Sequence, residues 1–163
     1  MKWLTFLGFL ICCWLVYSCG HNRRSRIYLI PEGFFGKVYL VFDQNDGTRV
    51  KNESGSVVYH IGSDGTLKTE GPFIAGSVKS QFFYITSDGK RVRLNYYDWI
   101  DLTDAKKNHL LDSSTAFVFK MEWGLAPSQG KTKKFETFYV VSIRNFDSVI
   151  NNVKYFYDKP IGN

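Results

Sequence analysis

Apolar and polar residues alternate along most of the chain after residue 26, in short runs separated by turn residues. This period of two predicts strands at 27–30, 36–43, 57–61, 66–69, 81–86, 91–96, 116–123 and 134–143. Asp64-Gly65 and Asp88-Gly89 supply turns of the kind found in hairpins. The runs at 81–86 and 91–96 are the clearest hairpin, and the two longest runs are expected to be antiparallel neighbours.

The run at 36–43 differs from the others because both of its faces are apolar. Val38, Leu40 and Phe42 share one face, and Tyr39 and Val41 share the other. Strands that are covered on both sides have this pattern. We therefore expect a central strand, buried on both faces.

A helical period appears only near the C-terminus. Phe146, Val149, Ile150 and Val153 recur at helical spacing, which predicts a helix over 145–157 with Asn145 as its N-cap. The pattern over 97–112 is ambiguous, and a loop with a helical turn around 103–109 is compatible with it. The expected fold is mainly β, an antiparallel β-sandwich with one C-terminal helix.

The first 18 residues follow a different pattern, which is typical of a signal peptide. Lys2 precedes a nearly uninterrupted apolar stretch from Trp3 to Val16, and two polar residues follow it. A helix that crosses a bilayer core of about 30 Å needs roughly 20 apolar residues, so this stretch is too short. Residues 1–18 are therefore predicted to be removed on export.

The segment Leu15-Val16-Tyr17-Ser18-Cys19-Gly20 resembles the lipobox of bacterial lipoproteins, although Tyr17 is bulkier than that motif usually has. The resemblance implies that the Cys19 thiol takes a diacylglyceryl group. Cys12 and Cys13 would leave with the signal, and no cysteine follows Cys19, so the mature chain has no disulfide. We expect a lipidated tether at 19–26 and a single domain at 27–163. The protein is expected to be located on the extracytoplasmic side of a bacterial envelope membrane.

The net charge adds little to this picture. The formal charge is +6, and it becomes +5 when Lys2 leaves with the signal, which contains no acid. Arg23, Arg24 and Arg26 lie beside the anchor, where each adds about 1 kcal/mol of attraction to an anionic leaflet. A nucleic-acid partner is not expected, because the chain has neither a binding motif nor a sustained basic stripe.

The sequence gives little support for the motifs of common catalytic and metal sites, since Ser-x-x-Lys occurs only at 87–90 and 128–131, within glycine-containing turns or loops. The three histidines, His21, His60 and His109, lack metal-ligand spacing, and no Gly-x-Ser-x-Gly occurs. We predict no catalytic residue, cofactor or metal. One cluster has two interpretations, either a solvated loop with helix-capping aspartates or a ligand or cation site. Its members are Tyr96, Tyr97, Trp99, Asp98 and Asp101, with Asp104 nearby.

Residues 27–73 resemble a family of small bacterial lipoproteins and secreted domains that is classified only as a domain of unknown function. The resemblance rests on Pro31-Glu32-Gly33, Gly36-Lys37-Val38, Asp43-Gln44 and Tyr59-His60-Ile61. It implies a shared fold and no activity. A looser similarity connects the chain to transthyretin-like sandwiches, including the regulatory domains attached to some carboxypeptidases, which mostly bind or scaffold.

Two functions remain open on the sequence. The first is a non-enzymatic envelope lipoprotein whose sandwich binds a protein or glycan or has a structural role. The alternative is a small envelope hydrolase or carbohydrate-acting enzyme that uses acids distant in sequence. A cleft that holds convergent acids would favour the enzyme.

Overall fold

The computed structural model describes residues 25–75, 78–128 and 131–151, so the predicted signal peptide and Cys19 lie outside the described residues. The strands are β1 (Ser25–Pro31), β2 (Gly36–Val41), β3 (Lys51–Glu53), β4 (Ser56–His60), β5 (Thr66–Lys68), β6 (Ser80–Ile85), β7 (Arg91–Tyr97), β8 (Phe117–Ser128) and β9 (Lys131–Val141). The helices are α2 (Trp99–Lys107) and α3 (Phe146–Asn151). Neither helix is long and apolar enough to cross a membrane.

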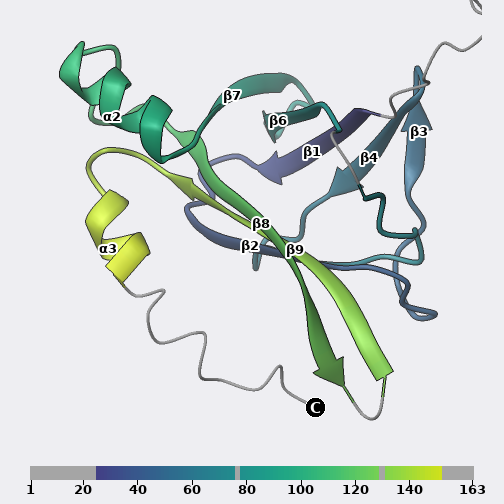
Figure 1. The fold of residues 1–163 in the computed structure, drawn as a ribbon. Coiled ribbons are helices and arrows are strands. Elements are labelled where there is room, and N and C mark those ends of the chain that lie inside the picture. The colour runs from purple at the N-terminus through teal and green to yellow at the C-terminus, as the bar shows by residue number, and fades with distance from the viewer. Residues whose placement is uncertain (1–24, 76–77, 129–130, 152–163) are drawn as a thin grey trace, which may run out of the picture.

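All nine strands belong to one mixed sheet, in the order β3-β4-β1-β6-β7-β8-β9-β2-β5 (Figure 1). The mainly β prediction is confirmed, but the antiparallel sandwich is wrong. Four pairs are parallel, namely β1 with β4, β1 with β6, β2 with β5 and β7 with β8. Alternating polarity specifies the faces of a strand but not its neighbours, so the sequence pattern could not reveal these pairs.

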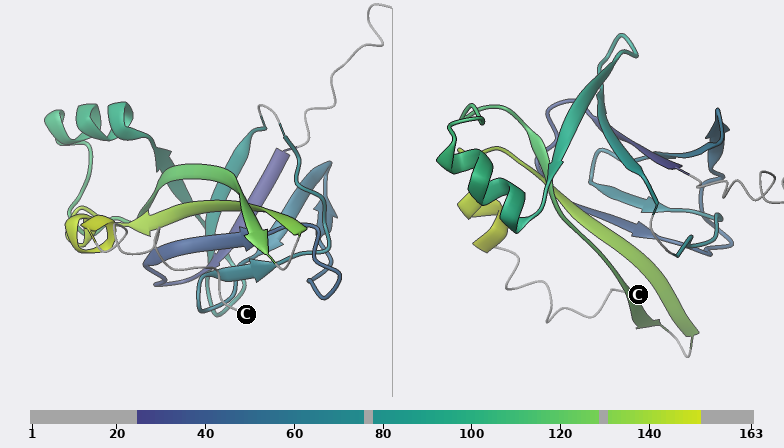
Figure 2. Two further views of the ribbon diagram at one scale, coloured as in Figure 1. Left: turned by 60° about the horizontal axis from the view of Figure 1, so that its bottom comes forward. Right: turned by 45° about the horizontal axis from the view of Figure 1, so that its top comes forward.

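The sheet folds back on itself, so that non-neighbouring strands face one another (Figures 1 and 2). Tyr28 of β1 meets Phe138 of β9 edge to face, with ring centroids 5.3 Å apart, and stacks on Phe82 of β6 at 4.9 Å. The buried cluster between the halves also takes Val38 and Leu40 from β2. One apolar core is therefore shared by both halves of a single sheet.

The two edges of the sheet meet at a single bridge between Thr48 and Thr69. Thr48 lies just before edge strand β3, and Thr69 directly follows edge strand β5. The Thr48 amide donates to the Lys68 carbonyl at 2.8 Å, and the buried Thr69 hydroxyl donates to the Thr48 carbonyl at 3.0 Å. A Cβ on Gly47 would lie 2.5 Å from the Thr69 backbone, so only glycine fits this approach.

The predicted hairpin of β6 with β7 and the predicted antiparallel pairing of β8 with β9 are confirmed, whereas the hairpin expected at the 63–65 turn is wrong. The second hairpin is longer than predicted, because its strands continue through most of the expected loop at 124–133. By contrast β4 and β5, although joined by the turn at 63–65, lie near opposite ends of the sheet order. A turn signal in the sequence therefore does not by itself establish strand pairing.

Strand β2 is buried mainly on one face and lies beside the edge strand β5, not at the centre of the sheet. Val38, Leu40 and Phe42 are fully buried in the shared core. On the other face Val41 is buried, but Tyr39 is half-buried and stacks on Phe135 with centroids 5.4 Å apart. The expectation of a central, two-sided strand is therefore wrong, while the burial of its even-numbered face is confirmed.

The expectation of a single helix is also wrong, because α2 occupies most of the ambiguous segment. It lies in the connection between the parallel strands β7 and β8, where a crossover is required. The predicted C-terminal helix is described at Phe146–Asn151, and its remainder lies outside the described residues. Asn145 does not cap it by side chain, since its Oδ1 accepts from the Ser142 amide at 2.6 Å.

The burial of β2 predicts the outcome of a pair of substitutions. Leu40→Ala should lower the free energy of unfolding by roughly 2–5 kcal/mol, because the fully buried side chain leaves a cavity that its neighbours fill only in part. Arg93→Ala, at an exposed position of β7, should change it by no more than about 0.5 kcal/mol. Urea unfolding of the chain from Gly20 onward measures both. Equal midpoints for the two variants would contradict the assignment of Leu40 to the core.

Candidate functional site

In the structure, the residues of the ligand cluster predicted from the sequence have different surroundings. Asp98 is the N-cap of α2, where its Oδ1 accepts from the Asp101 amide at 2.8 Å, and Asp101 lies in the first turn. Tyr97 packs edge to face on Phe117 at 5.4 Å, and Trp99 does the same on Phe119 at 4.7 Å. The capping interpretation therefore accounts for Asp98, while the carboxylate of Asp101 lies in the first turn, where a negative charge is favourable. Tyr96 alone of the five cluster residues lines the pocket described next.

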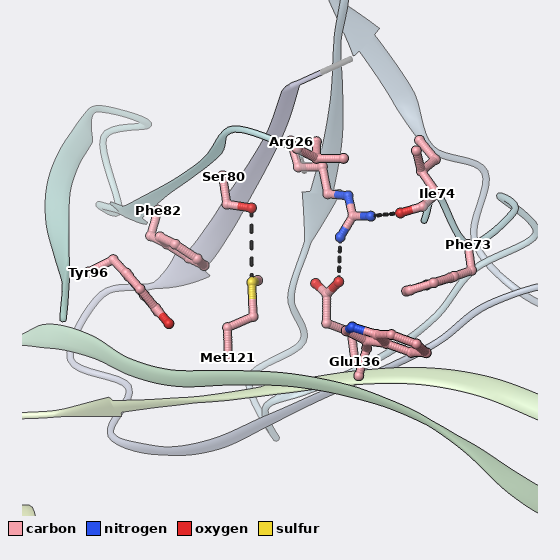
Figure 3. A pocket seen from close by; sticks show the side chains of 10 residues that line it. Arg26, Phe73, Ile74, Ser80, Phe82, Tyr96, Met121 and Glu136 are labelled. Atoms are coloured by element: carbon pink, nitrogen blue, oxygen red, sulfur yellow. Dashed lines mark hydrogen bonds and ion pairs between the residues drawn. The ribbon is translucent and has the colours of Figure 1, made fainter. Parts of the chain in front are cut away.

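A pocket of about 370 Å³ lies between the two halves of the folded sheet (Figure 3). Strands β1, β6, β7, β8 and β9 all contribute side chains to it, together with the segment that follows β5. The lining residues are Arg26, Phe73, Ile74, Val78, Ser80, Phe82, Tyr96, Met121, Trp123 and Glu136. The pocket is therefore a product of the fold as a whole.

A bulge in β8 directs two side chains into this pocket. Val118 pairs with Val140 and packs in the shared core, whereas Phe119 packs on the opposite face with the helices. The register then shifts between Phe119 and Glu122, and Lys120 has a positive φ of 52°. Because one extra residue reverses the alternation of faces, the odd-numbered Met121 and Trp123 line the pocket.

The inner part of the pocket holds a buried ion pair between Arg26 of β1 and Glu136 of β9, which are only 5% and 2% exposed. Arg26 Nη1 donates to Glu136 Oε2, and the Tyr28 hydroxyl donates to Glu136 Oε1. Arg26 Nη2 donates to the Ile74 carbonyl. Both oxygens of the carboxylate are therefore occupied, while the buried Arg26 Nε makes no hydrogen bond among the described residues.

Burial controls the protonation of these groups. Loss of solvation raises the pKa of the Glu136 carboxyl, although Arg26 and the Tyr28 hydrogen bond act in the opposite direction. Burial and the nearby Glu136 hold the pKa of Tyr28 well above its ordinary value. Tyr28 thus remains a neutral donor at physiological pH.

Aromatic rings form the walls of the pocket. Phe73 lies against Trp123 with centroids 5.6 Å apart, and Phe82 stacks on Tyr96 at 6.0 Å. Phe73 stands on one side of the pocket, and Phe82 and Tyr96 stand on the other (Figure 3). Trp123 is 68% exposed and Tyr96 is 42% exposed, so one ring of each pair is open to solvent.

The chemistry available in the pocket is limited. Glu136 is the only carboxylate among the described lining residues, whereas glycoside hydrolysis ordinarily uses two. In the described part of the chain, no group of three or more His, Cys, Asp and Glu residues is placed to hold a metal ion. The arrangement of open aromatic rings over a neutralised ion pair is suited to binding a ligand.

Sequence reasoning missed both members of the ion pair. Arg26 is the last residue of a basic segment, and the sequence therefore predicts that it belongs to the tether. In the structure β1 begins at Ser25, and Arg26 is buried. Glu136 shares its face of β9 with Phe138 and Val140, just as Arg26 shares a face of β1 with Tyr28. A charged residue at a core-facing position of each strand was the available signal.

A family described as of unknown function (DUF6843) matches residues 22–148 of the chain. The chain belongs to the DUF6843 family. The expectation of a family of unknown function, which came from residues 27–73, is confirmed, and the match extends over most of the folded domain. The looser similarity to transthyretin-like sandwiches receives no support from the comparisons. No curated protein matches the chain significantly.

The DUF6843 domain is similar in structure to the "Putative Lipoprotein from Bacillus anthracis", which has been solved by crystallography at 2.75 Å. The two share 20% sequence identity, with a TM-score of 0.53, over 72% of this chain and 69% of the other. At this identity the similarity shows a common fold.

The ion pair predicts a non-additive result in the DUF6843 domain. Glu136→Leu alone should cost about 3–5 kcal/mol of unfolding free energy, because it leaves Arg26 charged and buried without a partner. The double variant Arg26→Met/Glu136→Leu removes both charges and should be less destabilised than Glu136→Leu. Urea unfolding of the double variant and of both single variants, Glu136→Leu and Arg26→Met, tests this, and simple addition of the two single effects would show that the residues do not interact.

Proposed function

We propose that this DUF6843 protein is a lipid-anchored lipoprotein of the bacterial envelope, held on the extracytoplasmic side by Cys19, that binds a ligand without catalysing a reaction. The observation that carries the proposal is the pocket, where exposed aromatic rings surround an ion pair whose charges cancel. The lipobox-like segment before Cys19 and the lipoprotein description of the structural neighbour support the anchor.

A binding role fits the pocket better than a hydrolytic role. Both Glu136 oxygens accept hydrogen bonds from neighbouring side chains, so the carboxylate is engaged in holding the fold together. A general acid or base must be free to exchange a proton with the substrate. The open rings of Trp123 and Tyr96, by contrast, are surfaces on which a ligand can pack.

The short tether places the proposed binding site near the membrane. Arg26 lines the pocket and lies seven residues after Cys19 in the sequence. An extended chain spans at most about 3.6 Å per residue, so Arg26 lies within roughly 25 Å of Cys19. If Cys19 is lipidated, the pocket lies close to the membrane surface.

The anchor is tested by substituting its cysteine. Cys19→Ser should abolish incorporation of a fatty-acid analogue and release the protein from its lipid anchor, because the acylated thiol is gone. Metabolic labelling in a bacterial host measures this. Cys13→Ser is the matched control, since Cys13 lies within the predicted signal and its loss should leave labelling unchanged. Equal labelling of wild type and Cys19→Ser would contradict the anchor.

The pocket is tested by site-specific crosslinking in intact cells, with the anchor kept. A photoreactive phenylalanine analogue at position 123, which keeps an aromatic ring where Trp123 borders the pocket, should form an adduct. The same amino acid at position 99 should not, since Trp99 is also exposed but packs on Phe119 and Phe146. Absence of an adduct at 123, or equal adducts at both positions, would refute binding in this pocket.

A further inference from the structure

We infer that the pocket is a subsite for an uncharged sugar ring of an envelope glycan. This inference rests on the proposed binding function and specifies the class of ligand. It is carried by three properties of the lining side chains, namely the placement of the aromatic rings, the cancellation of charge and the polar groups that remain available.

The aromatic rings of the pocket are placed so that a flat ligand with apolar faces can pack between them. Sugar rings present C–H groups on their faces, and these pack favourably on the electron-rich faces of aromatic side chains. The Phe73–Trp123 pair and the Phe82–Tyr96 pair come from different strands and segments and line the same pocket (Figure 3). A ring that enters between them finds aromatic surface on both sides.

The electrostatics favour a ligand without net charge. Arg26 and Glu136 neutralise each other inside the pocket, so neither charge is free to attract an ion. An anionic ligand would approach the Glu136 carboxylate, and a cationic one would approach the Arg26 guanidinium. Either approach is costly where solvent is largely excluded. A neutral ring meets neither penalty.

Polar groups that line the pocket remain available for hydrogen bonds with the hydroxyl groups of a sugar. Among the described residues, the Ser80 hydroxyl has only the Met121 sulfur, at 4.0 Å, as its hydrogen-bond partner, and sulfur is a weak acceptor. The Tyr96 hydroxyl is directed toward the interior of the pocket (Figure 3).

The size of the pocket agrees with this assignment. Its volume of about 370 Å³ lies at the lower end of the range for small-molecule sites, roughly 300–1,000 Å³. The exposed Trp123 leaves the mouth open, so further units of a glycan can continue into solvent.

The test uses the full chain, purified with its anchor in a detergent that contains no sugar. Saturation-transfer NMR probes neutral di- to tetrasaccharides of glucose, galactose, mannose and N-acetylglucosamine. At least one should bind, and Trp123→Ala should weaken it tenfold or more. Trp99→Ala, the matched control at an exposed tryptophan outside the pocket, should bind as the wild type does. An oligosaccharide in which every unit of the binding sugar is replaced by its uronic acid should also bind tenfold or more weakly.

Three results would overturn the inference, namely no binding by any of these sugars, binding that Trp123→Ala leaves unchanged, or equal binding of the uronic acid. The proposed binding function is judged separately by the crosslink from position 123. If that adduct forms while no neutral sugar binds, the pocket binds a ligand of another class. If the adduct also fails to form, the binding function itself is refuted.

Discussion

The buried contact between Arg26 and Glu136 is the constraint on which the two halves of the sheet depend. Removing two charges from water is expensive, and the arrangement is tolerable only where each charge meets its partner in good geometry. Arg26 lies in β1 and Glu136 lies in β9, 110 residues apart in sequence, and Tyr28 and the Ile74 carbonyl complete their hydrogen bonds. A slip of either strand by one residue would turn its charged side chain to the other face. The pair therefore requires one register between the halves.

That register would not by itself produce an open pocket, and the bulge in β8 supplies the other requirement. Without the shift between Phe119 and Glu122, the even-numbered residues of β8 would continue to face inward, so Lys120 and Glu122 would be directed toward the ion pair. The bulge instead brings Met121 and Trp123 to that face, opposite the aromatic residues of β6 and β7. An apolar lining around a neutralised pair results from these two features together.

Much of the local structure could be predicted from the sequence, because alternation and turn residues are local signals. The hairpin β6–β7 and the pairing of β8 with β9 were of this kind. Parallel neighbours such as β1 and β6 were not, since their pairing depends on contacts between segments far apart in the chain. The site was missed for related reasons. A bulge has no reliable pattern, and Arg26 was indistinguishable from the basic residues before it until β1 placed it in the core.

The position of β1 has a mechanical consequence. It is the first strand after the predicted tether and lies between two parallel neighbours, β4 and β6. Tension applied from Cys19 would act along β1 and load its hydrogen bonds to both neighbours together, in shear, instead of opening them one after another. The Arg26 ion pair lies at the end of β1 where the load enters. Resistance to force is set by the rate of unfolding and not by equilibrium stability alone. The proposed attachment at Cys19 would thus place a strand that is paired on both sides between the anchor and the rest of the domain.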